Sequence, residues 1–398
     1  MKILFLANKP PYPPVDGGTI ATFGIMEALA DLGHQITVLV MNTKKHHVTP
    51  YQIPEHIAAK ITFHLVEVPA DIKPIPALKN LFFSKLPYNA QRFISKPYAK
   101  KLNALLRAQQ FDVIQLEGLY LCPYIELIKR CSKAIIAYRS HNVEYEIWER
   151  LMANSKGLRH VYLKVLHKRL KAFELAAINK YDLLLPITLR DGQVLSNLGN
   201  TKPVHVLPAG ISRIVQQSNE PINTNDLFFI GALDWMPNQE GLLWFLDKCW
   251  PEINRRFAKT TLTIAGRSAP KWLEDKFSLP NVFYKGEVPD AYEFMHKHGV
   301  MIVPLFSGSG MRVKIIEALA NRKPVVSTSV GCEGISLVNG KHILIGDTSN
   351  QFINALEQIF MQPDLAVDIA NNSINFVSDN FSNKKLAESL ADFYVKYK

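Results

Sequence analysis

Short apolar runs alternate with amphipathic stretches along most of the chain. The runs are continuous, which is typical of parallel strands that are covered on both faces of a sheet. The stretches between them repeat apolar residues every three or four positions, as helices do. We predict strands at residues 2–7, 34–41, 61–66, 111–117, 134–138, 181–188, 227–230, 302–305, 330–335 and 342–345. This alternation predicts the α/β class, with two doubly wound sheets.

A polar stretch between the two sets of strands predicts the domain boundary. Residues 212–226 are polar and contain turn-forming residues, so we interpret them as an interdomain linker. A first domain is expected over residues 1–211 and a second over residues 227–382. Each has about the size at which a chain can bury its own hydrophobic core. We expect a ligand in the cleft between the domains, at the carboxyl ends of both sheets.

Composition adds the class and compartment of the protein. The chain has 398 residues, of which 47% are hydrophobic and 20% charged, as in an ordinary globular protein. Its four cysteines form no CxxC pair, so we expect free, mostly buried thiols in a reducing compartment and no structural zinc. The first apolar run is too short for a signal peptide, and no run approaches the length of a membrane span. We therefore expect a cytoplasmic protein.

The net charge of +11 is confined to one half of the chain. Residues 1–200 hold 26 Lys and Arg against 15 Asp and Glu, whereas residues 201–398 hold 20 against 20. An anionic partner of the first half alone is indicated: membrane lipid, a lipid-diphosphate acceptor or nucleic acid.

One segment of the second half joins a glycine-rich turn to a helix. Residues 302–305 form a short apolar run, and Gly308 and Gly310 then interrupt regular structure. From Arg312 onward apolar residues recur at helical spacing until Pro324 ends the pattern. Glycines let a ligand approach the backbone, and the free N–H groups at a helix start point toward an anion. A diphosphate fits such a turn.

Charged residues near this turn suit the same ligand. Arg312 and Lys314 lie in the first helical turn, where the helix dipole disfavours cations and a bound anion would compensate them. Glu317, one turn further along, is placed to accept hydrogen bonds from sugar hydroxyls. Each feature also has a purely structural interpretation: a tight turn at Gly308 and Gly310, exposed cations, and a solvated carboxylate. Only the combination is specific.

This combination resembles the donor-binding motif of retaining, family 4 type glycosyltransferases with the GT-B fold. In that family two glutamates flank seven residues; the second holds the ribose of a nucleotide sugar and the first contacts the transferred sugar. Glu317, followed by Ala318, matches the second, whereas Ser309 stands at the position of the first. The segment is more similar to a subgroup with the pattern GSGxRxKxxEA, in which Arg312 and Lys314 accompany the glutamate. We expect Gly308, Ser309, Gly310 and Met311 to line the donor site.

The resemblance extends to the first domain. Gly17 and Gly18 follow the first strand, where these proteins carry a Gly-Gly loop that faces the donor phosphates or the acceptor. The dinucleotide pattern GxGxxG is missing here, and a simple turn is the alternative interpretation. His141 follows the strand at 134–138 and opens an HNxE pattern; a similar histidine faces the transferred sugar in this family. A histidine at a strand end can also be structural. The resemblance implies that the last helix, about 383–398, packs back on this domain.

In the second domain, Gly231 ends the first strand and Asp234 lies in the DWMPN loop that follows. Relatives usually carry phosphate-binding basic residues in this loop. Phosphate charge must then be met by Arg312, Lys314 and Arg267, because a guanidinium binds phosphate oxygens bidentately. The resemblance further implies two Rossmann-like domains that face each other across a cleft, and no obligatory metal. No DxD motif is present.

Two basic segments of the first half have two interpretations each. Residues 69–97 are rich in proline and aromatics, and we predict a loop with short helices; Leu81, Phe82 and Phe83 lie among lysines and either contact a membrane or acceptor lipid or pin the loop to the core. Residues 155–173 predict a basic helix with an apolar stripe. This helix either seeks an anionic lipid surface or packs on its own sheet with a solvated basic face.

We therefore predict a retaining glycosyltransferase, a hexosyltransferase-like enzyme. It would move a sugar from a nucleotide-diphosphate sugar to a glycan or lipid-linked acceptor in cell-surface polysaccharide or glycoconjugate synthesis. His141, Arg312 and Lys314 are the candidate catalytic residues; no cofactor, metal or nucleic acid is expected. Peripheral attachment at the inner face of a membrane is the alternative to a purely cytoplasmic location. The rival functions are a nucleotide-sugar epimerase or hydrolase on the same fold, a non-catalytic binding protein and an NAD-dependent dehydrogenase, which the missing GxGxxG disfavours.

Overall fold

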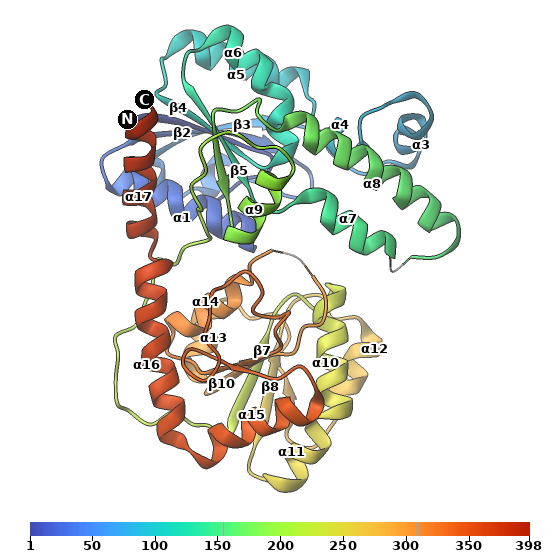
Figure 1. Cartoon of the computed structure of the whole chain (residues 1–398), viewed down its shortest axis with the longest axis vertical. Coiled ribbons are helices and arrows are strands. Elements are labelled where there is room, and N and C mark those ends of the chain that lie inside the picture. The colour runs from blue at the N-terminus through green and yellow to red at the C-terminus, as the bar shows by residue number, and fades with distance from the viewer. Residues whose placement is uncertain (154, 309) are drawn as a thin grey trace. The chain divides into compact units, whose positions relative to one another are not determined.

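The computed structural model describes the whole chain except residues 154 and 309 and the side chains of residues 158 and 159 (Figure 1). Its contacts divide the chain into two compact units. The first unit comprises Met1–Gly210 and Asn383–Lys398, and the second comprises Ile211–Ser382. The predicted linker is packed as part of the second unit: the Val215 N–H donates to the carbonyl of Ala320 at 3.0 Å, and Arg213 lies over the ring of Tyr292.

The first unit is built on a parallel six-stranded sheet in the order β3-β2-β1-β4-β5-β6. Its strands are β1 (Lys2–Ala7), β2 (Gln35–Asn42), β3 (Ile61–Glu67), β4 (Val113–Glu117), β5 (Ile135–Ser140) and β6 (Leu183–Pro186). Its helices are α1 (Gly17–Asp31), α2 (Glu55–Ala58), α3 (Pro74–Phe83), α4 (Tyr88–Gln91), α5 (Lys96–Ala108), α6 (Ile125–Cys131), α7 (Glu144–Ala153), α8 (Gly157–Ala177), α9 (Leu189–Asn197) and α17 (Asn383–Tyr397). The strand order reverses between β1 and β4, the place where doubly wound sheets bind ligands.

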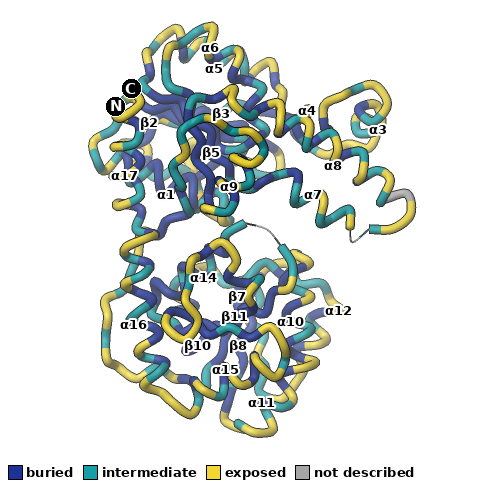
Figure 2. Tube along the Cα trace, viewed as in Figure 1, coloured by how far each residue is buried: buried dark blue, intermediate teal, exposed yellow. Residues whose placement is uncertain are grey.

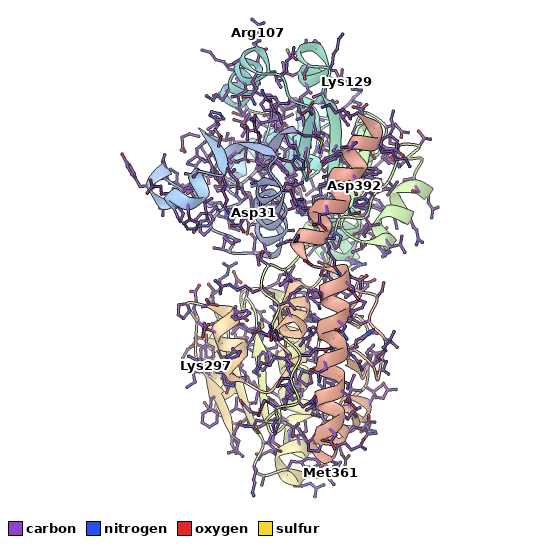
Figure 3. All side chains as sticks on the ribbon, turned by 90° about the vertical axis from the view of Figure 1, so that its left-hand side faces the viewer. Asp31, Arg107, Lys129, Lys297, Met361 and Asp392 are labelled. Carbon is purple, nitrogen blue, oxygen red and sulfur yellow. The ribbon has the colours of Figure 1, made fainter. Side chains whose placement is uncertain are left out.

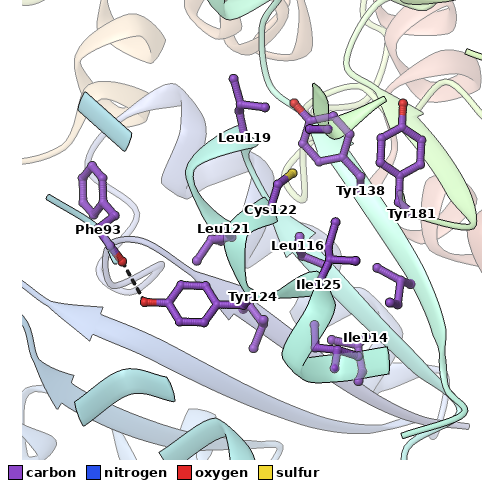
Figure 4. Close-up of a cluster of buried hydrophobic side chains, with 14 of the residues drawn as sticks. Phe93, Ile114, Leu116, Leu119, Leu121, Cys122, Tyr124, Ile125, Tyr138 and Tyr181 are labelled. Carbon is purple, nitrogen blue, oxygen red and sulfur yellow. Dashed lines mark hydrogen bonds between the residues drawn. The ribbon is translucent and has the colours of Figure 1, made fainter. Parts of the chain in front are cut away.

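Apolar side chains cover both faces of this sheet, as the continuous apolar strands require. The trace of the sheet is accordingly coloured mostly as buried in Figure 2. On one face, residues that follow β4 form one cluster with Tyr138 and Tyr181, and the Tyr124 hydroxyl donates to the carbonyl of Phe93 at 2.7 Å (Figure 4). On the other face, α17 packs against α1 and places Leu390 and Tyr394 in the core. Figure 3 shows α17, which carries Asp392, along this unit. The last 16 residues thus complete the core of the first unit.

The second unit has a parallel sheet in the order β12-β11-β10-β7-β8-β9, which reverses between β7 and β10. Its strands are β7 (Asp226–Ile230), β8 (Thr261–Ala265), β9 (Val282–Tyr284), β10 (Val300–Val303), β11 (Val325–Ser327) and β12 (Leu344–Ile345). Its helices are α10 (Met236–Lys248), α11 (Trp250–Arg256), α12 (Lys271–Glu274), α13 (Ala291–Lys297), α14 (Val313–Ala320), α15 (Ser349–Met361) and α16 (Pro363–Asn380). The predicted α/β fold of two doubly wound sheets is confirmed.

The strand predicted at residues 330–335 is wrong, because this segment forms turns. The Thr328 hydroxyl accepts a hydrogen bond from the N–H of Gly331 at 3.0 Å, and the Cys332 N–H donates to the Thr328 carbonyl. These hydrogen bonds form a turn directly after β11, so the segment does not extend as a strand. Apolar content alone cannot distinguish a buried turn from a buried strand.

The alternatives for the two basic segments are now resolved in part. Helix α8 buries Leu163, Leu166 and Leu170 against its own unit, as in the second interpretation of that segment. Residues 74–83 form α3, one of the short helices predicted in this segment, and Phe82 and Phe83 are exposed, so they do not pin the segment to the core. All four cysteines are free. Within the described residues, none of the helices is long and apolar enough to cross a bilayer.

Candidate functional site

The reversal of strand order in the second unit brings together most of the residues predicted for donor binding. The loop after β7 begins at Gly231, and the turn after β10 holds Gly308 and Gly310 before α14. Since β7 and β10 are neighbouring parallel strands, their carboxyl ends open onto the same edge of the sheet. Ser309, a predicted donor contact, lies outside the described residues.

Both described glycines of the turn have backbone conformations that favour glycine. Gly308 has φ 117° and Gly310 has φ 76°. A Cβ atom on Gly308 would also lie 2.8 Å from Nη2 of Arg312 and 2.9 Å from the ring of Trp235. A larger residue at this position would therefore disturb two side chains of the site as well as the backbone.

Arg312 is buried and is folded back over this turn. Its Nη1 donates to the carbonyl of Gly310, and its guanidinium carbon lies 5.7 Å from the ring centroid of Trp235, which is 38% exposed. The residue directly precedes α14, so its charge sits beside the N–H groups of the helix start. Met311, the residue between the turn and Arg312, is half-buried.

Lys314 links the two loops of the site. Its Nζ donates to the carbonyl of Ile230 at 3.2 Å and to Oδ1 of Asn238 at 3.1 Å, and lies 4.4 Å from the ring centroid of Phe229. Burial, together with the nearby charge of Arg312, lowers the pKa of Lys314 to about 7. An anion bound here would raise this pKa again, since it would supply the missing counter-charge.

Gly231 is required by the same contact. A Cβ atom there would lie 2.8 Å from Nδ2 of Asn238 and 3.2 Å from Nζ of Lys314. Asn238 is itself buried and donates through Nδ2 to the carbonyl of Ala232 at 2.8 Å. The Asn238 amide therefore both holds the loop after β7 in place and orients the ammonium of Lys314.

Glu317 lies one turn into α14 and is half-buried. Burial raises its pKa to about 7, and the negative charge of Asp290 contributes in the same direction. Within the part of the chain that the structure describes, no side-chain hydrogen bond or ion pair of this carboxylate is found. The carboxylate can accept hydrogen bonds, and the hydroxyl groups of a ligand would supply the donors.

Two of the predicted residues lie at the rim of this group. Asp234 and Arg267 are exposed. Their loops are adjacent, because the Leu233 N–H donates to the carbonyl of Arg267 at 2.9 Å. The site thus has two inner cations, at Arg312 and Lys314, and a third cation on an exposed loop.

The first unit holds a separate polar cluster at the carboxyl end of β4. Nε2 of His141 lies 2.7 Å from Oε2 of Glu117, and the Thr22 hydroxyl donates to the same oxygen at 2.8 Å. Arg139, fully buried, approaches that oxygen at 3.7 Å. Burial would raise the pKa of Glu117, but Arg139, His141 and Thr22 outweigh it and hold the pKa at about 2.

An ionised Glu117 determines how His141 is presented. A carboxylate only accepts hydrogen bonds, so Nε2 of His141 carries the proton that lies between them. The other ring nitrogen, Nδ1, is buried and has no hydrogen-bond partner among the described residues. The other carboxylate oxygen accepts from Nε2 of Gln115 at 2.5 Å, and Gln115 accepts from the Tyr394 hydroxyl at 2.5 Å. Tyr394 of α17 is thus linked to His141 through the side chains of Gln115 and Glu117.

Gly17 and Gly18 begin α1, whose first turn is already capped. Asp16 accepts from the Thr19 N–H at 2.9 Å and forms an ion pair with Lys9 at 2.6 Å. Gly18 leaves ordinary van der Waals space for a Cβ atom, 3.4 Å from the Asp16 carboxylate. The loop therefore presents the Lys9–Asp16 pair beside the glycines rather than an uncapped helix start.

Sequence reasoning missed Glu117 and Arg139, which support His141. It placed Trp235 and Asn238 in the DWMPN loop but did not assign them their contacts with Arg312 and Lys314. A signal existed for the first pair, because each is a charged residue in an otherwise apolar strand, and parallel pairing of β4 and β5 sets Glu117 beside Arg139. Asn238 and Trp235 gave no comparable signal, since their roles depend on the approach of the turn after β10.

Comparison with known proteins agrees with this geometry. Residues 224–362 match the family described as "Glycosyl transferases group 1". The matched residues lie within the second unit, and they include the turn, Lys314 and Glu317. The match supports a glycosyltransferase.

Similar proteins extend over the whole chain. An "Uncharacterized 44.6 kDa protein in cps region" of Klebsiella pneumoniae is 21% identical over 399 residues and covers 98% of both chains. HepE of Anabaena, solved in complex with UDP-glucose, superimposes with a TM-score of 0.67 at 14% identity over 100% of both chains. Sucrose-phosphate synthase of Thermosynechococcus elongatus gives 0.69 at 16% identity, over 100% of this chain and 99% of that one. The chain has the GT-B fold of these structures.

The Glu317→Gln variant tests the cost of the buried carboxylate. Folding raises the pKa of Glu317 from 4.5 to about 7, so the free energy of unfolding of the protein falls as the pH rises through this range. The cost in stability is fully present above pH 7. The variant should raise the free energy of unfolding by about 1–3 kcal/mol at pH 8, and the gain should fade between pH 7 and 4.5. Urea unfolding measures both. The exposed Glu333→Gln is the matched control, and an equal gain in both variants would contradict the assignment.

The Glu117→Gln variant should have the opposite effect. In the native protein the pKa of Glu117 is lowered from 4.5 to about 2. The ionised carboxylate therefore stabilises the fold above pH 4.5, and this stabilisation is lost as the pH falls toward 2. Removing the charge also leaves Arg139 buried without its counter-ion. We expect a loss of about 3–5 kcal/mol at pH 7 that narrows below pH 4.5, measured by urea unfolding. Glu126→Gln, an exposed change in the same unit, should have no effect; a neutral Glu117→Gln would refute the buried ion pair.

Proposed function

We propose that the protein is a retaining glycosyltransferase that moves a sugar from a nucleotide-diphosphate sugar to a glycan or lipid-linked acceptor. The observation that carries the proposal is the arrangement of Arg312, Lys314 and Glu317 around the glycine turn, within a domain that matches glycosyl transferases group 1. Two cations and an unmatched acceptor at one helix start correspond in sign and position to a diphosphate next to a hydroxylated ring.

The electrostatics of the site suit the departure of a nucleoside diphosphate. Negative charge develops on the leaving diphosphate as the bond to the sugar breaks, and groups preorganised for that charge lower the barrier. Lys314 is held in place by Ile230 and Asn238 before any ligand arrives, and its lowered pKa reflects a missing counter-charge. Arg312 is similarly held by Gly310. Glu317 would accept hydrogen bonds from the ribose hydroxyls.

His141 is the residue of the first unit that we assign to the transferred sugar. Glu117 fixes its Nε2 proton, so Nδ1 is the nitrogen left for a ligand hydroxyl. Such a contact would orient the sugar ring while the acceptor attacks, and correct positioning of reactants contributes several kcal/mol to a barrier.

The biological setting follows from the relatives. One relative is named for its place in a cps region, and HepE was solved with UDP-glucose. We propose that this chain serves cell-surface polysaccharide or glycoconjugate assembly, that its donor is a nucleotide sugar of the same kind and that it acts in the cytoplasm. Product analysis separates this from the rivals: a glycoside identifies a transferase, whereas an epimer or free sugar identifies the alternative enzymes.

Substitutions in the site should reduce turnover while the protein stays folded. Glu317→Ala should weaken donor binding, and Arg312→Ala should slow the chemical step, each by about 10- to 150-fold in kcat/KM, which corresponds to the loss of charge-assisted hydrogen bonds. Transfer of radiolabelled sugar to a glycan or lipid-linked acceptor measures both. Glu333→Ala and Lys297→Ala, exposed changes in the same unit, are the controls. A folded Glu317→Ala protein with the turnover of the native protein would overturn the site assignment.

We further propose that turnover needs no metal ion, because Arg312, Lys314 and the start of α14 supply the positive charge that a metal otherwise provides. Treatment with EDTA should leave the initial rate unchanged. Loss of activity that Mg²⁺ or Mn²⁺ restores would contradict this part of the proposal, without affecting the assignment of Glu317.

A further inference from the structure

Helix α3 has an inverted arrangement of polar and apolar side chains. Among its residues only Asn80 is buried, whereas Ile75, Leu78 and Phe82 are 71%, 58% and 71% exposed. A helix on the surface of a protein normally turns its apolar stripe toward the core. Here the stripe, at spacings of three and four residues, is exposed to solvent, and most residues of α3 are exposed (Figure 2).

Polar contacts on the inner side hold the helix in this orientation. Asn80 donates through Nδ2 to the carbonyl of Leu86 at 3.0 Å and also to the side chain of Gln91. Arg169, on α8, donates to the carbonyls of Asn80 at 3.1 Å and Leu81 at 2.7 Å. The orientation is therefore determined by specific hydrogen bonds, and the outward apolar face is a built feature of the unit.

The apolar face continues beyond both ends of the helix. Ile72 precedes it at 72% exposure, and Phe83 and Leu86 follow at 88% and 38%. We call these six residues the α3 face: Ile72, Ile75, Leu78, Phe82, Phe83 and Leu86. Six large apolar side chains exposed within 15 residues exceed the scattered exposure that is normal for a monomer, and they mark an interaction site.

The charges around the α3 face have a single sign. Lys73, Lys79 and Lys85 lie between its members, and the sequence from residue 72 to 98 contains no Asp or Glu. Helix α8, which lies beside α3 (Figure 1), has no acidic residue before Glu174, and that side chain is buried. Exposed Lys164 and Lys168 extend the basic surface along α8.

We propose that the α3 face docks on an anionic lipid bilayer. A helix of ten residues is about 15 Å long, half of what is needed to span a bilayer, so it lies in the plane of the interface. The apolar side chains enter the boundary between head groups and acyl chains, and the lysines remain among the anionic head groups. Nucleic acid would match the lysines but not the aromatic and aliphatic face, and a bilayer matches both.

The inference does not depend on the proposed function, because it concerns a surface of the first unit and is tested without donor or acceptor. The purified full-length protein is mixed with vesicles of phosphatidylglycerol and phosphatidylcholine, or of phosphatidylcholine alone, and the bound fraction is measured by co-sedimentation. Binding should require the anionic lipid and should weaken in 0.5 M salt, since screening shortens the reach of the lysines.

Two variants with matched controls locate the contact. Phe82→Ser with Phe83→Ser should lower the partition coefficient about tenfold or more, whereas Met361→Ser with Val395→Ser, which removes two exposed apolar side chains elsewhere, should leave it unchanged. Lys79→Glu with Lys85→Glu should also reduce binding, and the exposed pair Lys129→Glu with Lys297→Glu (Figure 3) should reduce it less.

Three outcomes would overturn the proposal. The first is no binding to anionic vesicles by the native protein. The second is equal binding to neutral vesicles. The third is equal binding by the native protein and the Phe82→Ser, Phe83→Ser variant. If sedimentation velocity instead shows a dimer that this variant abolishes, and vesicles bind neither form, the face joins two copies of the chain.

Discussion

The second unit depends on one contact, the ammonium of Lys314 held between the carbonyl of Ile230 and the amide of Asn238. This contact joins the end of β7, the first turn of α10 and the first turn of α14, which are the three elements that meet where the strand order reverses. Such a buried cation is unfavourable unless a counter-charge is present. The fold thus holds the ammonium of Lys314 beside Arg312 without an acidic partner among the described residues, and a bound anion would supply the counter-charge.

The two units treat their buried carboxylates in opposite ways. Glu117 is surrounded by donors and is stabilised in its ionised form, so it serves as a fixed charge that orients His141. Glu317 has no such donors among the described residues and resists ionisation. A fully satisfied carboxylate contributes to stability, whereas an unsatisfied one is retained at a cost in stability. The contrast shows that Glu117 is paired with side chains of its own unit, whereas Glu317 is the carboxylate for which we propose a ligand partner.

Most strands could be predicted from the sequence because buried parallel strands are continuous apolar runs, and the glycine turn could be predicted because its spacing from Arg312 and Glu317 is local. Errors arose where tertiary contacts decide. The apolar segment at 330–335 became a turn through bonds to Thr328. The short helices predicted within residues 69–97 are present, but their bounds were not predicted; prolines in the first turn of α3 are compatible with a helix start. The burial that shifts the pKa of Lys314 comes from distant segments and has no local signal.

The docking of α17 has a consequence for synthesis on the ribosome. The first unit is discontinuous in sequence, because its core includes Leu390 and Tyr394 from the last 16 residues, whereas the second unit is continuous. Chains emerge amino end first and domains fold as units. The second unit can therefore fold while the first still lacks α17, and the hydrogen bonds from Tyr394 through Gln115 to Glu117 form only after α17 has been synthesised. A nascent or carboxyl-truncated chain would carry a complete donor domain and an unfinished partner domain.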